Sequence, residues 1–78
     1  MHAEDIKQLI ERGLACEKVE VRGDDGVHFE ALVVSGAFTD KRLLERHRLV
    51  YATLGPRMGT DIHALSLVTR TPAEQAGA

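Results

Sequence analysis

A helical segment stands between two strand patterns, and this order restricts the fold of the chain more than any other feature. Residues 27–34 form the first strand pattern, in which Phe29, Ala31 and Val33 share one face. Residues 41–54 follow with helical periodicity, and residues 62–69 form another apolar strand. A helix that joins two parallel strands of one sheet almost always makes a right-handed crossover. Such a crossover would lay these two strands parallel to each other.

A hairpin precedes this crossover. Residues 3–14 have the pattern of an amphipathic helix, and residues 18–22 alternate as a half-buried strand. The turn Gly23-Asp24-Asp25-Gly26 then reverses the chain, because glycine and aspartate supply the dihedral angles and local hydrogen bonds of a tight turn. The strand at 18–22 should therefore pair antiparallel with the next strand.

Capping signals define the remaining helices. Thr39 or Asp40 can cap the central helix. Thr71-Pro72-Ala73-Glu74 is a capping box with proline at the first helical position, so a short last helix should begin there. We predict a single α+β domain over residues 1–78, with the order α-β-β-α-β-α. Its three-stranded mixed sheet should be packed by helices on one face.

The predicted topology bears on the positions of two histidines. His28 lies near the start of the second strand, and His63 lies near the start of the third. Parallel neighbouring strands begin at the same edge of a sheet and lie about 5 Å apart. If the second and third strands are neighbours, the two imidazoles could therefore form a pair at one edge, where they could ligate a metal or face a partner.

Composition limits the function classes. The formal net charge of −2 argues against general attraction to nucleic acid. The single cysteine, Cys16, excludes an internal disulfide. No leader pattern or bilayer-length apolar run is present, which favours a cytoplasmic protein without a membrane segment. No nucleophile–base pair, phosphate loop or carboxylate dyad is evident, so we do not expect an enzyme.

Four stretches together resemble the BolA family over about residues 19–74. They are Val27-His28-Phe29-Glu30-Ala31-Leu32-Val33-Val34-Ser35, then Phe38 with Leu44-Glu45-Arg46-His47-Arg48-Leu49-Val50-Tyr51, then Ile62-His63-Ala64-Leu65-Ser66-Leu67, and finally Thr71-Pro72-Ala73-Glu74. The resemblance implies a fold like the type II KH domain, which agrees with the predicted element order.

The resemblance also implies a partner and a cofactor. Members of the family pair with monothiol glutaredoxins and share a [2Fe-2S] cluster, to which the glutaredoxin and glutathione supply thiolates. The BolA-like chain supplies a histidine that matches His63, and a second His or Cys comes from the loop between the hairpin strands. That loop contains no cysteine here, and its nearest imidazole is His28. Asp25 could ligate through oxygen, although a carboxylate suits an iron–sulfur site poorly.

These implications predict an adaptor in iron–sulfur cluster trafficking or in redox and iron sensing. No cofactor is expected in the isolated chain, which should be a monomer or a weak homodimer. Some family members are described as DNA-binding transcriptional regulators, so DNA binding is the alternative.

The alternative would use a basic run on the central helix. Its members are Lys41, Arg42, Arg46 and Arg48. Such a run is usually a solvated helix face, with Glu45 as an intrahelical partner. It could instead contact phosphates, or dock the glutaredoxin or the carboxylates of glutathione. The sequence leaves these three interpretations open.

Overall fold

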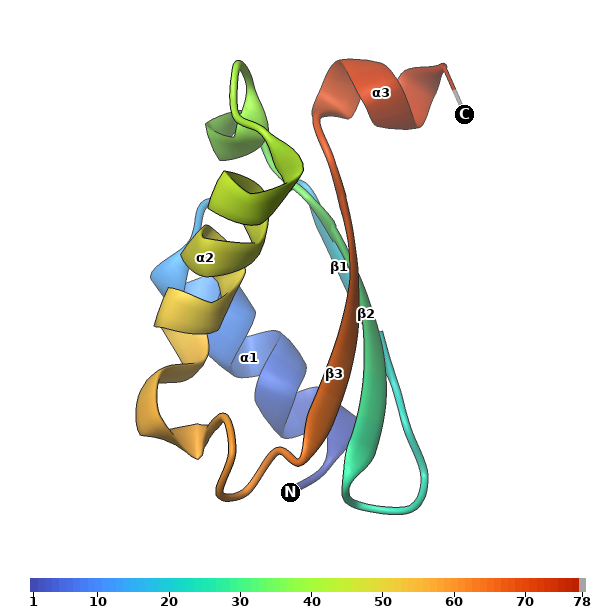
Figure 1. Ribbon diagram of the computed structural model, residues 1–78. Helices are drawn as coiled ribbons and strands as arrows, with labels where there is room; N and C mark the ends of the chain where they lie inside the picture. Colours follow the sequence, from blue (N-terminus) through green and yellow to red (C-terminus); the bar gives the residue numbers. More distant parts are fainter. Residues whose placement is uncertain (78) are drawn as a thin grey trace.

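The computed structural model describes residues 1–77, in which two helices pack on one face of a three-stranded sheet (Figure 1). The elements are α1 (Ala3–Gly13), β1 (Lys18–Arg22), β2 (His28–Val34), α2 (Leu43–Leu54), β3 (Ala64–Arg70) and α3 (Pro72–Ala76), with the 3-10 turns η1 (Gly36–Phe38) and η2 (Gly55–Arg57). The predicted α+β class and element order are confirmed.

The sheet has the order β1-β2-β3, with β1 antiparallel and β3 parallel to β2. In the parallel pair, His28 lies opposite Ala64 and Val34 lies opposite Arg70. The crossover rule therefore predicted the direction of β3 correctly, and the structure shows that β2 is its neighbour. The turn from β1 to β2 depends on Gly23, where a Cβ atom would lie 2.5 Å from the carbonyl oxygen of His28.

Alternation along β2 places its apolar residues against α1 and α2. Phe29, Ala31 and Val33 point into the core, while His28 and Glu30 are exposed on the opposite face. The fully buried core also takes residues from both helices and from the loops, namely Ile6, Ile10, Phe38, Val50, Leu54 and Ile62. The core thus holds β2 rigidly, and His28 stands at the first position of that strand.

The start of α2 differs from the prediction. The helix begins at Leu43, and the backbone N–H of Arg42 donates to Oε1 of Glu45, so neither Thr39 nor Asp40 is the cap. The reason is the η1 turn, after which Asp40 takes a left-handed backbone conformation (φ 64°) instead of the extended one that an N-cap needs. Leu43 falls on one helical stripe with the buried Val50 and Leu54, yet it is 64% exposed because this first turn extends beyond the core.

The start of β3 also differs. The strand begins at Ala64 and ends at Arg70, so Ile62 and His63 precede it. Ile62 is buried, but its N–H donates to the carbonyl of Arg57 (2.9 Å) and its carbonyl accepts from Gly59 (2.9 Å). Its backbone is therefore tied to the loop after α2, which leaves His63 as the link between that loop and the sheet.

Candidate functional site

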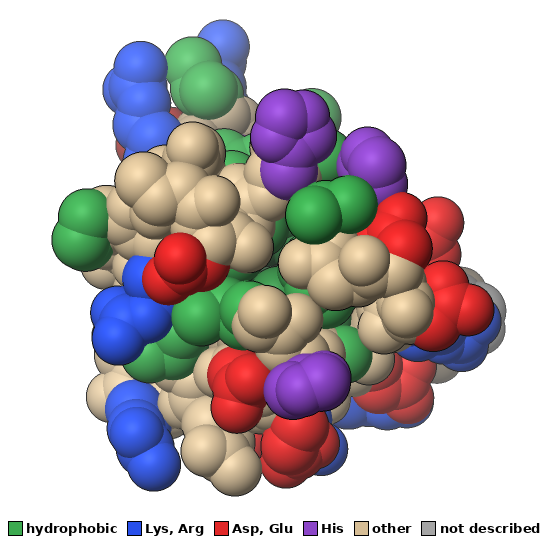
Figure 2. All heavy atoms as spheres, turned by 90° about the horizontal axis from the view of Figure 1, so that it is seen from below, with side chains coloured by type: hydrophobic (Ala, Val, Ile, Leu, Met, Phe, Trp, Pro, Cys, Tyr) green, Lys and Arg blue, Asp and Glu red, His purple; other side chains and the backbone are tan. Residues whose placement is uncertain are grey.

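The two predicted imidazoles do lie side by side. The ring centroids of His28 and His63 are 5.9 Å apart, with the ring planes at 89°, and both residues are exposed. Figure 2 views the molecule from the end where β2 and β3 begin, and histidine side chains there lie on the surface near acidic ones. The parallel register creates this pair, because it brings the start of β2 beside the residue that leads into β3.

Asp25 fixes the orientation of His28. Its Oδ1 accepts the backbone N–H groups of Val27 (2.9 Å) and His28 (2.8 Å), and its Oδ2 lies 2.7 Å from Nδ1 of the His28 ring. The backbone N–H of His28, then that of Val27 and then the ring hold the pKa of the Asp25 carboxyl well below its usual range. We call His28, His63 and Asp25 the histidine end.

The donor set of the histidine end suits a borderline or soft metal. Imidazole nitrogens are common ligands of zinc and iron, at metal–nitrogen distances of about 2.0–2.1 Å for zinc. Two rings on one ion then have centroids roughly 5–6 Å apart, which includes the observed spacing of 5.9 Å. Within residues 1–77, no group of three or more His, Cys, Asp or Glu side chains is placed to hold a metal ion.

A depression of about 550 Å³ adjoins His28 on the open face of the sheet. His28, Asp25 and Arg22 line it together with neighbouring residues of the hairpin turn and the starts of β2 and β3. His28 and Asp25 are therefore open to another molecule that approaches from the side opposite the helices.

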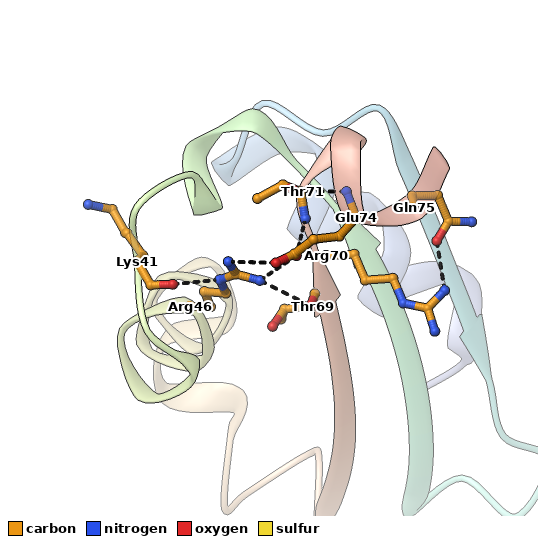
Figure 3. A network of polar contacts seen from close by, with 7 residues as sticks. All are labelled: Lys41, Arg46, Thr69, Arg70, Thr71, Glu74 and Gln75. Atoms are coloured by element: carbon orange, nitrogen blue, oxygen red, sulfur yellow. Dashed lines mark hydrogen bonds and ion pairs between the residues drawn. The ribbon is translucent and has the colours of Figure 1, made fainter. Parts of the chain in front are cut away.

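Arg46 behaves differently from the other cations of the basic run. Its guanidinium forms two bonds to the Glu74 carboxylate, with Nη1–Oε1 at 2.7 Å and Nη2–Oε2 at 3.2 Å, while Nε donates to the carbonyl of Lys41 at 2.8 Å (Figure 3). It also lies over the ring of Phe38, and its side chain is only 13% exposed. The Arg46 guanidinium is therefore already engaged within the chain, and its role in partner binding stays a prediction.

The same contacts secure α3. Thr71 and Glu74 form the predicted capping box: Thr71 N–H donates to Glu74 Oε1 (2.8 Å), and Glu74 N–H donates to Thr71 Oγ1 (3.1 Å). The Arg46 hydrogen bond, followed by that from the Thr71 backbone, lowers the pKa of Glu74 from 4.5 to about 2. We call Arg46, Glu74, Thr71 and Phe38 the clamp end.

The three other cations of the run, Lys41, Arg42 and Arg48, are exposed. Lys41 and Arg42 directly precede α2, and Arg48 lies in its first half. This part of α2 lies beside the end of β3, as the contact from Arg46 to the carbonyl of Thr69 (3.5 Å) shows. The histidine end lies at the start of β3, about 20 Å away along a seven-residue strand. The predicted metal ligands and the predicted basic surface are thus separate regions.

Sequence reasoning missed two contacts. One is the pairing of Asp25 with the His28 ring, for which an aspartate three residues before a histidine in a turn was an available signal. The other is the bond from Arg46 to Glu74, which joins residues far apart in the chain and has no local signal.

Comparisons with known proteins agree on one family. A family model described as BolA-like protein matches residues 9–74. The chain is 37% identical over 78 residues to BolA-like protein 1 of Homo sapiens, covering 88% of this chain and 57% of that protein. It is 46% identical over 50 residues to the DNA-binding transcriptional regulator BolA of Escherichia coli K12, covering 64% and 48%. The chain therefore spans less than two thirds of either relative.

A solved structure supports the same assignment. The structure of a bolA protein homologue from Coxiella burnetii superposes with a TM-score of 0.87 at 51% identity and covers 97% of both chains. In residues 1–77, no helix has the length and apolar character needed to cross a membrane.

Proposed function

This chain belongs to the BolA-like protein family, and we propose that it is an adaptor that binds a monothiol glutaredoxin and shares a [2Fe-2S] cluster with it. The observation that carries the proposal is the exposed imidazole pair, with ring centroids 5.9 Å apart at the rim of a rigid sheet. His63 is the ligand that the family resemblance implies. His28 is the second ligand, in place of a hairpin-loop cysteine.

In this complex each partner supplies the ligands of one iron. Two imidazoles on one iron make a Rieske-like arrangement, in which histidine in place of thiolate raises the reduction potential of a [2Fe-2S] centre. Thiolates of the glutaredoxin and of glutathione hold the other iron. The open face beside His28 leaves room for such a partner.

The test is to mix the chain with a cluster-loaded monothiol glutaredoxin and to record visible absorption and circular dichroism. The wild-type chain should change the spectrum, because imidazole nitrogens replace thiolate ligands on one iron. The His63→Ala variant should lose that change. His2→Ala, which removes another exposed histidine, is the matched control and should behave like wild type. A His63→Ala spectrum identical to wild type would contradict the proposal.

DNA binding is a second candidate, favoured by the name of the Escherichia coli relative and by three exposed cations beside the clamp end, namely Lys41, Arg42 and Arg48. Binding through them should weaken steeply as salt rises, by a slope of about 0.9 per neutralised phosphate. Replacing the three by glutamine should reduce that slope, measured by fluorescence anisotropy with duplex DNA. His63→Ala should leave it unchanged, since His63 lies at the opposite end. Equal slopes for the wild type and the triple variant would argue against this surface.

A further inference from the structure

The Asp25 carboxylate makes one more contact than the hairpin turn needs. Oδ1 alone accepts the backbone N–H groups of Val27 and His28, which closes the turn. Oδ2 points instead to the His28 ring and lies 2.7 Å from Nδ1. The turn therefore leaves one carboxylate oxygen available to act on the imidazole.

That contact determines where the ring proton resides. An ionised carboxylate can only accept hydrogen bonds, so Nδ1 must carry the hydrogen that bridges to Oδ2. A neutral imidazole has a single ring proton, and the lone pair is then left on Nε2. Ligating histidines are commonly held in this way, with the nitrogen away from the metal donating to a carboxylate.

We propose that Asp25 is a positioning residue that holds the ring proton of His28 on Nδ1, so that Nε2 is the atom that ligates a metal beside His63. The metal-ligating part rests on the proposed function, whereas the tautomer is a property of the chain by itself. Asp25 is not a ligand in this arrangement, because both of its oxygens already accept hydrogen bonds.

The two histidines are thus unequal. His28 is oriented by Asp25, while His63 forms no side-chain hydrogen bond within residues 1–77. One ring of the pair is fixed and the other can adjust. This assigns Asp25 a role that the neighbouring Asp24, on the same exposed turn, does not share.

Asp25→Asn isolates this role. The amide oxygen can still accept from the backbone of Val27 and His28, so the turn is retained, but the amide NH₂ group can only donate to Nδ1. The neutral ring must then carry its proton on Nε2, which blocks that nitrogen. Asp24→Asn is the matched control, because it removes the same charge one residue away.

The first measurement is long-range ¹H–¹⁵N NMR of the metal-free chain, at a pH where the His28 ring is neutral. Wild type and Asp24→Asn should show the His28 proton on Nδ1, and Asp25→Asn should show it on Nε2. A wild-type proton on Nε2, or an unchanged proton position in Asp25→Asn, overturns the proposal. A thermal melt of each variant confirms that it is folded.

The second measurement is titration with Zn²⁺ alone, followed on the same ring signals. Wild type and Asp24→Asn should bind alike, and Asp25→Asn should bind about 10- to 100-fold more weakly. Equal affinity in Asp25→Asn, or no effect of Zn²⁺ on the wild-type rings, overturns the ligating role of Nε2. If both results hold but the chain leaves the glutaredoxin cluster spectrum unchanged, the proposed function fails and the role of Asp25 stands.

Discussion

At the clamp end, Arg46 and Glu74 satisfy each other through two hydrogen bonds over a buried Phe38 ring, whereas at the histidine end His63 stands exposed beside His28. Both ends belong to one small sheet, and both carry residues that the sequence marked for binding. This difference shows that a charged side chain in a binding motif is available to a partner molecule only if no other residue of the fold pairs with it. Stability should therefore depend on the clamp end, and partner binding on the histidine end.

The largest effect on stability is expected for Phe38→Ala. Phe38 is fully buried beneath Arg46, so its truncation removes apolar contacts and leaves a cavity. We expect the free energy of unfolding to fall by about 3–5 kcal/mol, measured by urea denaturation. Phe38→Leu retains most of the apolar volume and serves as the milder control. A loss below about 1 kcal/mol for Phe38→Ala would show that the clamp end contributes little to the stability of the core.

A smaller loss is expected for Arg46→Met, which keeps much of the aliphatic stem but removes the guanidinium that joins α2 to α3. We expect a cost on the order of 1–2 kcal/mol. Arg46→Lys keeps the charge but lacks the forked donor geometry, so it should recover only part of the loss. Full recovery with lysine would mean that charge alone matters at this position.

Acid should weaken the clamp end in a defined window. The pKa of Glu74 is lowered from 4.5 to about 2 by its partners, so its stabilising contribution is complete above pH 4.5 and is lost as the pH falls through about 2. Glu74→Gln should therefore flatten the fall in the free energy of unfolding between these values. The Asp25 carboxyl, whose pKa is also lowered, contributes in the same direction. If Glu74→Gln had the same pH profile as wild type, the bond to Arg46 would not stabilise the fold.

The smallest change in stability is expected for His63→Ala. The side chain is exposed and outside the core, so the free energy of unfolding should change by about 0.5 kcal/mol or less. Thermal melting and cluster spectra should be measured on the same His63→Ala sample. Together they separate an effect on stability from an effect on cluster binding. A large loss of stability would place His63 in the fold and remove the basis for calling it a free ligand.

Local and topological rules predicted much of this molecule. Thr71 and Glu74 form the expected capping box because both partners lie within one turn of the chain. The proximity of His28 and His63 was predicted for the case that the two parallel strands are neighbours, and the pairing of β2 with β3 meets that condition. In both cases the deciding physics was local backbone geometry or strand direction.

The failures came from interactions that periodicity does not encode. Leu43 fits the helical stripe, but the stripe does not reveal that the first turn of α2 extends past the sheet. Asp40 is a good capping residue by type, yet the η1 turn gives it a left-handed backbone. The hydrogen bond from Arg46 to Glu74 depends on the position of α3 after β3, and only the folded structure determines that position.

The parallel pairing of β2 with β3 has a further consequence during synthesis on the ribosome. His28 is made early and His63 much later, and the two meet only after α2 has carried the chain back across the length of the sheet. In a nascent or misfolded chain the two imidazoles are far apart. The pair exists only after β2 and β3 have paired, so its presence reports that the sheet is complete.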